Sequence, residues 1–228
     1  MRAGNVPLLV VRPAGTPPFP TVLWFHGLGV SKNTHEKELQ QLAAAGFLAV
    51  GVDAAGHGER ALPALPQRIA EASQEEALRL MLPLAELTAR DVPLVVRTLA
   101  DEGLADERRI ALAGISMGAY VVYRAVGIVQ GIRAAVALLG SPEWPEGISP
   151  HWDPAAFRQT AILSITAERD VNVPPGGARD FHHVLDEDRD RAAPARYLEL
   201  PGATHLMNDA DWTRAMTETV AWLRRFNS

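Results

Sequence analysis

Short runs of apolar residues alternate with longer stretches of mixed polarity along most of the chain. Strongly apolar runs occupy residues 47–52, 109–113, 132–139 and 161–167. Runs of this length and composition are typical of strands that are buried on both faces of a parallel sheet. The stretches between them are long enough to form helices, so the pattern predicts an α/β fold with helices on both faces of a mostly parallel central sheet.

Weaker signals complete this outline. We predict further strands at residues 6–11, 21–25 and 196–200, and helices at about 34–45, 93–102 and 119–126. The first of these helices is expected to be capped by Asn33 or Thr34 and to end at Gly46. Near the end of the chain, Trp212, Met216, Val220 and Leu223 fall on one face of a helix with a period of 3.6 residues.

Two segments are predicted to be insertions that shape a pocket. The first, at about 59–90, contains the capping box Ser73-Gln74-Glu75-Glu76, and Pro83 is expected to kink or divide the helix that follows. The second, at about 142–157, carries four prolines together with Trp144, Trp152 and Phe157. Either these aromatic side chains form an apolar acyl pocket, with Trp144 and Trp152 contacting the substrate, or they anchor the loops to the core.

Composition narrows the class of protein. At 228 residues the chain has the length of one α/β domain, so a single domain over residues 1–228 is predicted. The net charge of −5 and the lack of a lysine- and arginine-rich cluster argue against binding of nucleic acid. The chain has no cysteine, no run as long as a membrane span, and no apolar signal-peptide core in residues 1–5. A cytoplasmic protein without membrane contact is therefore expected, and a homodimer is left open.

One pentapeptide carries specific chemistry. Residues 114–118 read Gly-Ile-Ser-Met-Gly and directly follow a strand-like run. In the pattern G-x-S-x-G a strand turns sharply into a helix, the glycines remove side chains that would collide, and the serine is exposed at the tip. The pentapeptide alone is common. The hypothesis that Ser116 is a nucleophile therefore requires a base, a carboxylate and oxyanion donors elsewhere in the chain.

Candidates for all of these groups come just after predicted strands, where open α/β sheets place their chemistry. Asp170 follows the run at 161–167, His205 follows the strand at 196–200, and His26-Gly27-Leu28-Gly29 follows the strand at 21–25. Two other carboxylates remain alternatives to Asp170. Glu168 follows the same run, and Glu143 follows the run at 132–139.

Other polar residues are expected to have structural roles. His26 is expected to order the glycine-rich loop, and Asp53 and His57 to shape the turn Asp53-Ala54-Ala55-Gly56-His57-Gly58. The spacing of His182, His183 and Asp186 would suit a metal on one helix face, but no third strong ligand or H-E-x-x-H pattern accompanies them. A solvated helix face is therefore predicted there, and no metal site.

Together these motifs resemble the α/β-hydrolase superfamily, and within it the compact dienelactone-hydrolase and prolyl-oligopeptidase-like esterases. The resemblance covers nearly the whole chain, from about Val6 to the last helix. It implies the chain order serine, carboxylate, histidine. The implied site consists of a nucleophile, an orienting acid, a general base and two oxyanion amides, which are Ser116, Asp170, His205, and the backbone of Leu28 and Met117. Relatives often have glycine where this chain has Ala167, which keeps Glu168 open as the acid.

The function that the resemblance implies is a serine hydrolase of the carboxylesterase type. Its partner would be a small-molecule ester with a small or medium acyl chain, and it would need no cofactor. An acyl thioesterase would use the same triad, and a catalytically silent receptor or scaffold with this fold is the alternative from another class. A dienelactone hydrolase proper fits less well, because its nucleophile is a cysteine and this chain has none.

Overall fold

A central sheet runs through the computed structural model, which describes residues 1–144 and 153–228. Within these residues the sheet has eight strands in the order β1-β2-β4-β3-β5-β6-β7-β8. The strands are β1 (Arg2–Ala3), β2 (Val6–Val11), β3 (Phe19–Phe25), β4 (Leu48–Val52), β5 (Ala105–Ile115), β6 (Ile132–Leu138), β7 (Ala161–Ala167) and β8 (Ala195–Leu200). β2 is antiparallel to β1 and β4, and all other neighbours are parallel. The predicted mostly parallel sheet is thus confirmed.

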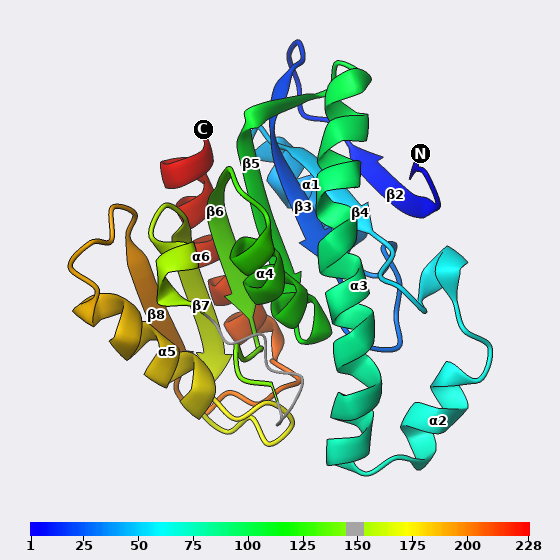
Figure 1. Cartoon of the computed structure of the whole chain (residues 1–228), viewed down its shortest axis with the longest axis vertical. Coiled ribbons are helices and arrows are strands. Elements are labelled where there is room, and N and C mark those ends of the chain that lie inside the picture. Colours follow the sequence, from blue (N-terminus) through cyan, green and yellow to red (C-terminus); the bar gives the residue numbers. More distant parts are fainter. Residues whose placement is uncertain (145–152) are drawn as a thin grey trace.

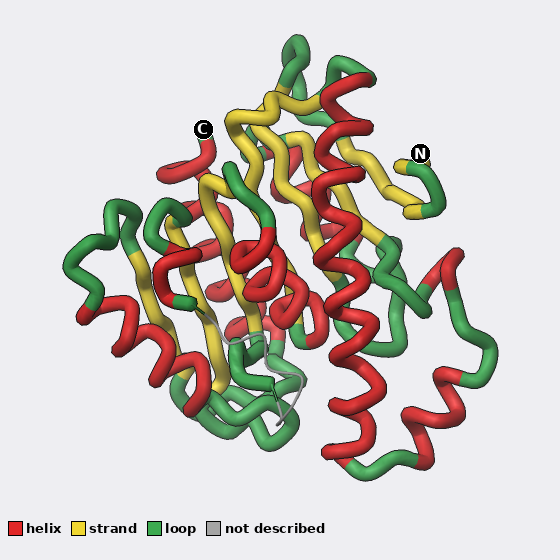
Figure 2. The backbone as a smooth tube through the Cα atoms, viewed as in Figure 1, coloured by secondary structure: helices red, strands yellow, loops and turns green. Residues whose placement is uncertain are grey.

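Helices cover both faces of this sheet, as Figures 1 and 2 show. The helices are α1 (Glu36–Ala44), α2 (Leu65–Glu71), α3 (Gln74–Asp101), α4 (Met117–Ile128), α5 (Gly176–Glu187) and α6 (Asp209–Asn227), with short 3₁₀ turns at Gly58–Arg60 and Pro154–Phe157. Side chains of α3, α4 and α5 share one core cluster, and those of α1 and α6 share the other. The chain therefore has three layers, with the sheet in the middle.

The middle strands are mostly apolar because both of their faces are covered. In β3, Leu23 and Phe25 belong to the cluster beneath α3 and α4, whereas Val22 and Trp24 belong to the cluster beneath α1 and α6. Successive side chains of a strand point to opposite faces, so a doubly covered strand needs apolar residues at every position. This explains why β4, β6 and β7 also read as continuous apolar runs.

The predicted division at Pro83 is wrong. Residues 74–101 form one continuous helix, α3, which contains both Pro83 and Pro93. Each proline removes one helical hydrogen bond, but buried side chains from Met81 to Leu99 pack the part of the helix around both prolines onto α4 and β5. The second half of the predicted 59–90 insertion is therefore the first half of a core helix. The predicted capping box is confirmed, with Ser73 and Glu76 bonded to each other's backbone amides.

The start of α1 also differs from the prediction. The helix begins at Glu36 with His35 as a cap whose side chain makes no capping bond to the backbone, and the predicted cap Thr34 instead accepts the amide of Ser31 at 3.3 Å. Gly46 ends the helix as predicted, with a φ of 100° that favours glycine. None of the described helices is long and apolar enough to cross a membrane.

Candidate active site

The turn between β5 and α4 holds Ser116 in a conformation that residues with a Cβ rarely adopt. Its φ is 54° and its ψ is −117°. The backbone around it is crowded, because a Cβ added to Gly114 would overlap the carbonyl group of Gly118, and a Cβ added to Gly118 would overlap the carbonyl oxygen of Phe25. The Ser116 amide also donates to Leu138 O at 2.8 Å. The two glycines therefore allow strand, turn and helix to pack this closely around the serine.

Side chains from two other loops meet at Ser116. His205 Nε2 lies 3.0 Å from Ser116 Oγ, and His205 Nδ1 lies 2.7 Å from Asp170 Oδ2. The three residues come from the ends of β5, β8 and β7, which share one edge because these strands are parallel. In this arrangement Nε2 can accept the serine proton while Nδ1 donates to the carboxylate.

The carboxylate of Asp170 is fixed by a turn of its own loop. Its side chain is fully buried, and Oδ1 accepts the backbone amides of Asn172 and Val173, each at 2.9 Å. Oδ2 is the oxygen that contacts His205. An aspartate that accepts amides two and three residues further on forms a local turn. The orientation of the carboxylate toward the imidazole therefore depends on residues 170–173.

The two alternative carboxylates have other partners. Glu168 Oε2 accepts the amide of Gly202 at 2.6 Å. Glu143 is exposed, and its Oε2 lies beside the start of α5, where a Cβ added to Gly177 would be 2.7 Å away. In the described part of the chain neither of them contacts the imidazole of His205, so Asp170 is the carboxylate that the structure brings to it.

The loop after β3 borders the serine. A Cβ added to Gly27 would lie 3.7 Å from Ser116 Cβ and 3.8 Å from Ile115 O. The next residue is Leu28. Among the described residues, the amides of Leu28 and Met117 donate to no protein acceptor. Free amide donors beside a serine hydroxyl are the groups that an oxyanion requires.

His26 joins this loop to the loop after β4. Its Nε2 accepts the amide of Ala54 at 3.1 Å, so its proton lies on Nδ1, which donates to Gly27 O at 2.7 Å. Burial lowers the pKa of His26 to about 4. The ring is therefore neutral near pH 7 and can keep both bonds, in agreement with the predicted ordering role. His57 is bonded within its own turn, where Nδ1 donates to Ala55 O at 2.9 Å.

Asp53 supports the same loops from the end of β4. Its buried carboxylate accepts the amide and the ammonium group of Lys32, at 2.8 and 2.9 Å, and the amide of Glu59 at 2.9 Å. Burial alone would raise the pKa of Asp53, but the hydrogen bonds and the charge of Lys32 outweigh it and the pKa is lowered. A Cβ added to Gly58 would overlap this carboxylate. The prediction that Asp53 braces this turn is confirmed.

The described aromatic residues of the second insertion are buried. Trp144 is 7% exposed, and its ring lies edge-on to that of Tyr120 with centroids 6.5 Å apart. Phe157 packs edge-on against Phe181 at 4.9 Å. These are the contacts of loop anchors, and contact of Trp144 with a substrate stays a prediction. Trp152 lies outside the described residues.

The predicted solvated helix face is wrong at His182. This residue is 3% exposed, and its Nε2 lies 2.8 Å from Ser164 Oγ, which in turn lies 2.7 Å from the Tyr123 hydroxyl. Burial lowers the pKa of His182 to about 4. His182 is on the inner face of α5, and His183 and Asp186 are exposed. In the described ranges, no cluster of three or more histidine or carboxylate side chains is arranged to bind a metal.

Two residues beside the site have no sequence motif that marks them. Tyr120 lies one helical turn after Ser116, and burial, followed by the charges of Asp170 and Glu143, raises its pKa. Its spacing of four residues from the serine is the sequence signal that could have indicated it. Gln74 contacts the loop after Asp170 from a distant part of the chain, and no local pattern indicates such a contact.

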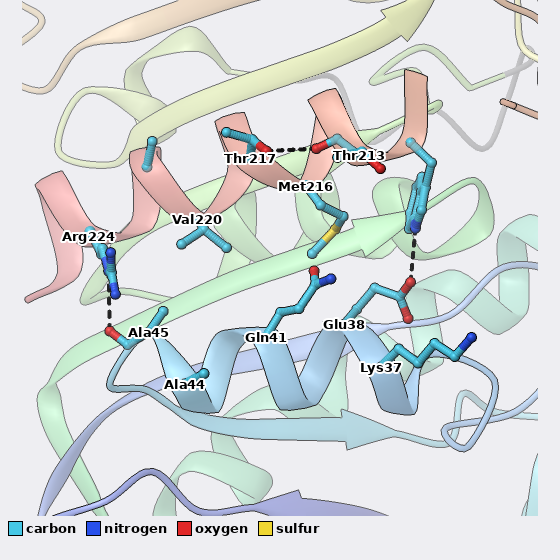
Figure 3. A pocket seen from close by; sticks show the side chains of 12 residues that line it. Lys37, Glu38, Gln41, Ala44, Ala45, Thr213, Met216, Thr217, Val220 and Arg224 are labelled. Atoms are coloured by element: carbon cyan, nitrogen blue, oxygen red, sulfur yellow. Dashed lines mark hydrogen bonds between the residues drawn. The ribbon is translucent and has the colours of Figure 1, made fainter. Parts of the chain in front are cut away.

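A surface groove shares none of its lining residues with this site. It lies between α1 and α6 (Figure 3). Two hydrogen bonds cross it, from Trp212 Nε1 to Glu38 Oε1 at 2.9 Å and from Arg224 Nε to Ala45 O at 3.4 Å. Between these bonds the side chains of Gln41, Met216 and Val220 face the groove. It contains none of the polar groups gathered around Ser116.

Comparison with known proteins gives one family and several relatives. The model of the alpha/beta hydrolase family matches residues 22–225. The Bacillus subtilis (strain 168) protein named "Putative esterase YitV" is 32% identical over 127 residues. This match covers 56% of the chain and 47% of that protein, so the chain spans about half the length of this relative.

Solved structures share the fold at low sequence identity. A puromycin-hydrolyzing peptidase of Mycobacterium tuberculosis has a TM-score of 0.75 and 18% identity, with 98% of the chain and 37% of the peptidase covered. A protein of Klebsiella pneumoniae named as a "Putative Dienelactone Hydrolase" has a TM-score of 0.73 and 19% identity, with 97% of the chain and 94% of that protein covered. At such identities the likeness concerns the fold.

Proposed function

The chain belongs to the alpha/beta hydrolase family, and on this premise we propose that it is a serine esterase that cleaves carboxylic esters of small to medium acyl chains. Ser116 is the nucleophile, His205 is the general base, and Asp170 orients the imidazole. The observation that carries the proposal is the continuous line of hydrogen bonds from Ser116 Oγ through His205 to Asp170.

In the first half-reaction, His205 Nε2 takes the proton of Ser116 as the hydroxyl oxygen attacks the ester carbonyl carbon. The amides of Leu28 and Met117 stabilise the negative charge that develops on the carbonyl oxygen. Asp170 stays ionised and stabilises the imidazolium. His205 then gives its proton to the leaving alcohol, and the acyl group remains bound to Ser116 Oγ.

The second half-reaction releases the acid. His205 Nε2 takes a proton from a water molecule, whose oxygen attacks the acyl carbon, and the same two amides stabilise the second oxyanion. Collapse of this intermediate returns the proton from His205 to Ser116. Both halves use the same imidazole, so its orientation affects turnover whichever half is slower.

The preference for esters rests on likeness. The Bacillus subtilis relative, which is 32% identical to the chain over the matched residues, is named an esterase. The Klebsiella pneumoniae protein named a dienelactone hydrolase matches the chain over nearly its full length. Fold alone does not fix a substrate. We propose further that residues 1–228 act as one domain, with the segments at about 59–90 and 142–157 bordering the substrate.

Hydrolysis of p-nitrophenyl esters from acetyl to dodecanoyl tests the proposal. Wild type is expected to be active, with a chain-length optimum that gives the size of the pocket, and Ser116→Ala is expected to be inactive with an unchanged melting temperature. Ser141→Ala is the matched control, because it removes another hydroxyl just after a strand of the same sheet. Wild-type rates in Ser116→Ala would overturn the assignment of the nucleophile. Turnover of acyl thioesters but of no ester would replace esterase by thioesterase.

A further inference from the structure

The first residue of α3 contacts the loop that carries Asp170. The side-chain amide of Gln74 donates to Val171 O at 2.7 Å and to Asn172 O at 2.9 Å. These carbonyl groups belong to the two peptide units whose N–H groups, on Asn172 and Val173, both donate to Asp170 Oδ1 at 2.9 Å. Each of the two peptide units therefore lies between Gln74 on its carbonyl side and Asp170 on its amide side.

Such an arrangement strengthens both sets of bonds. A carbonyl that accepts a hydrogen bond polarises its peptide unit, and the N–H of the same unit becomes a better donor, so chains of hydrogen bonds reinforce one another. The two N–H groups then hold the carboxylate of Asp170 more firmly. The line continues through Oδ2 to His205 and from there to Ser116.

The backbone of Gln74 is well placed for this contact. Ser73 caps α3 with both bonds of the capping box, so the first turn of the helix is fixed. From Met81 to Leu99, α3 is packed into the core over several turns. Gln74 is thus a side chain on a rigid element that reaches across to a loop of exposed residues, with Val171 77% exposed.

We infer that Gln74 is a positioning residue, which orients Asp170 toward His205 through the peptide units of residues 171–173 and so couples the start of α3 to turnover. This inference rests on the proposed function, since it assigns to Gln74 a role in the same triad. Gln74 touches no reacting atom, and its effect passes through the loop.

Two nearly isosteric variants test the inference. Gln74→Met keeps the length of the side chain and removes the donors. Gln74→Glu also places an acceptor against two carbonyl oxygens, while a carboxylate in the first turn remains favourable for the helix. Gln67 provides the matched control, because it lies in the neighbouring helix α2 and its side-chain amide donates to Glu71 Oε1 of the same helix, at 2.8 Å. The control variants are Gln67→Met and Gln67→Glu.

We expect kcat of Gln74→Met to fall about three- to tenfold, the range that corresponds to the loss of ordinary hydrogen bonds, and that of Gln74→Glu to fall further. KM should change less than about twofold, because the effect acts on the transition state rather than on ester binding. The Gln67 variants should keep wild-type kinetics. Equal kinetics in the Gln74 and Gln67 variants would overturn the inference, as would a rise in KM at constant kcat.

A spectroscopic measurement reports on the same contact without substrate. The proton between His205 Nδ1 and Asp170 is expected to give a low-field resonance, which is assigned by its absence in His205→Gln. In Gln74→Met this resonance should shift and exchange faster with solvent than in Gln67→Met, and an unchanged resonance would contradict the inference. A serine variant that kept its activity would instead refute the proposed function, whatever the Gln74 variants do.

Discussion

Gly118 packs its Cα against the carbonyl oxygen of Phe25, and a Cβ added at Gly118 would overlap that oxygen. Phe25 ends the strand that leads into the loop of Leu28, so this contact holds that loop next to the start of α4. The contact is between backbone atoms, and backbone cannot move aside as a flexible side chain would. The second glycine of the G-x-S-x-G pattern is therefore required by packing between strand and helix.

We expect Gly118→Ala to lower the free energy of unfolding by about 3 kcal/mol, the upper end of the usual cost of overpacking. Gly127, in the same helix, has no atom within 4 Å of an added Cβ, so Gly127→Ala should stabilise the protein by about 0.5–1 kcal/mol. Urea unfolding of the two variants and wild type measures both effects. A Gly118→Ala variant as stable as wild type would show that Phe25 can move away.

Much of the site could be predicted because parallel strands end at one edge of the sheet. Ser116, Asp170 and His205 each follow a predicted strand, and such positions converge at one edge of a parallel sheet. The resemblance indicates Asp170 as the acid, but the sequence leaves its neighbour Glu168 open as an alternative, since both come just after β7. The choice depends on side-chain direction, and Glu168 turns to the amide of Gly202.

Other features depend on contacts that no local pattern contains. Gln74 bonds to residues 97 and 98 positions away, and its position in a capping box indicates only a helix start. The continuity of α3 through Pro83 results from burial along the helix, which outweighs the local effect of proline. The burial of His182 results from α5 turning that face toward Ser164.

Replacement of the buried carboxylate of Asp53 should be costly. Asp53→Asn keeps the shape but leaves the ammonium group of Lys32 with Glu59 as its remaining partner among the described contacts. We expect a loss of about 3 kcal/mol in the free energy of unfolding, typical of breaking a buried ion pair. Glu59→Gln is the control, because the Glu59 side chain is 55% exposed and an exposed ion pair contributes little to stability. Denaturant unfolding measures both variants, and an equal loss of unfolding free energy in Asp53→Asn and Glu59→Gln would refute this prediction.

Buried histidines should make the fold sensitive to acid, because burial lowers the pKa of His26, His57 and His182. Burial lowers the pKa of both His26 and His182 to about 4, below the value of about 6.5 in an unfolded chain. The unfolded state therefore binds protons first as the pH falls. The contribution of the neutral rings to the free energy of unfolding is fully present above about pH 6.5. It is lost as the pH falls toward 4, at up to about 1.4 kcal/mol per pH unit for each histidine.

The variant His182→Gln isolates one of these groups, because glutamine is neutral throughout this range and can still bond to Ser164. Urea unfolding at intervals from pH 7 to pH 4.5 should give a shallower dependence of stability on pH than wild type. His183→Gln, next in sequence and exposed, should keep the wild-type dependence. Parallel curves for His182→Gln and wild type would mean that His182 is not a source of the acid sensitivity.

Asp170→Asn should separate orientation of the imidazole from the fold. The remaining oxygen can still accept the amides of Asn172 and Val173, but the new NH₂ group would face His205 Nδ1 and favour the tautomer with its proton on Nε2, which cannot take the serine proton. We expect kcat for p-nitrophenyl esters to fall about 10⁴-fold, as in other serine triads, with little change in melting temperature. Glu143→Gln and Glu168→Gln make the same chemical change at the two alternative acids and should each stay within about threefold of wild type, because neither side chain contacts the imidazole. A large loss in one of these two variants, with near-normal turnover in Asp170→Asn, would transfer the role of the acid to that glutamate.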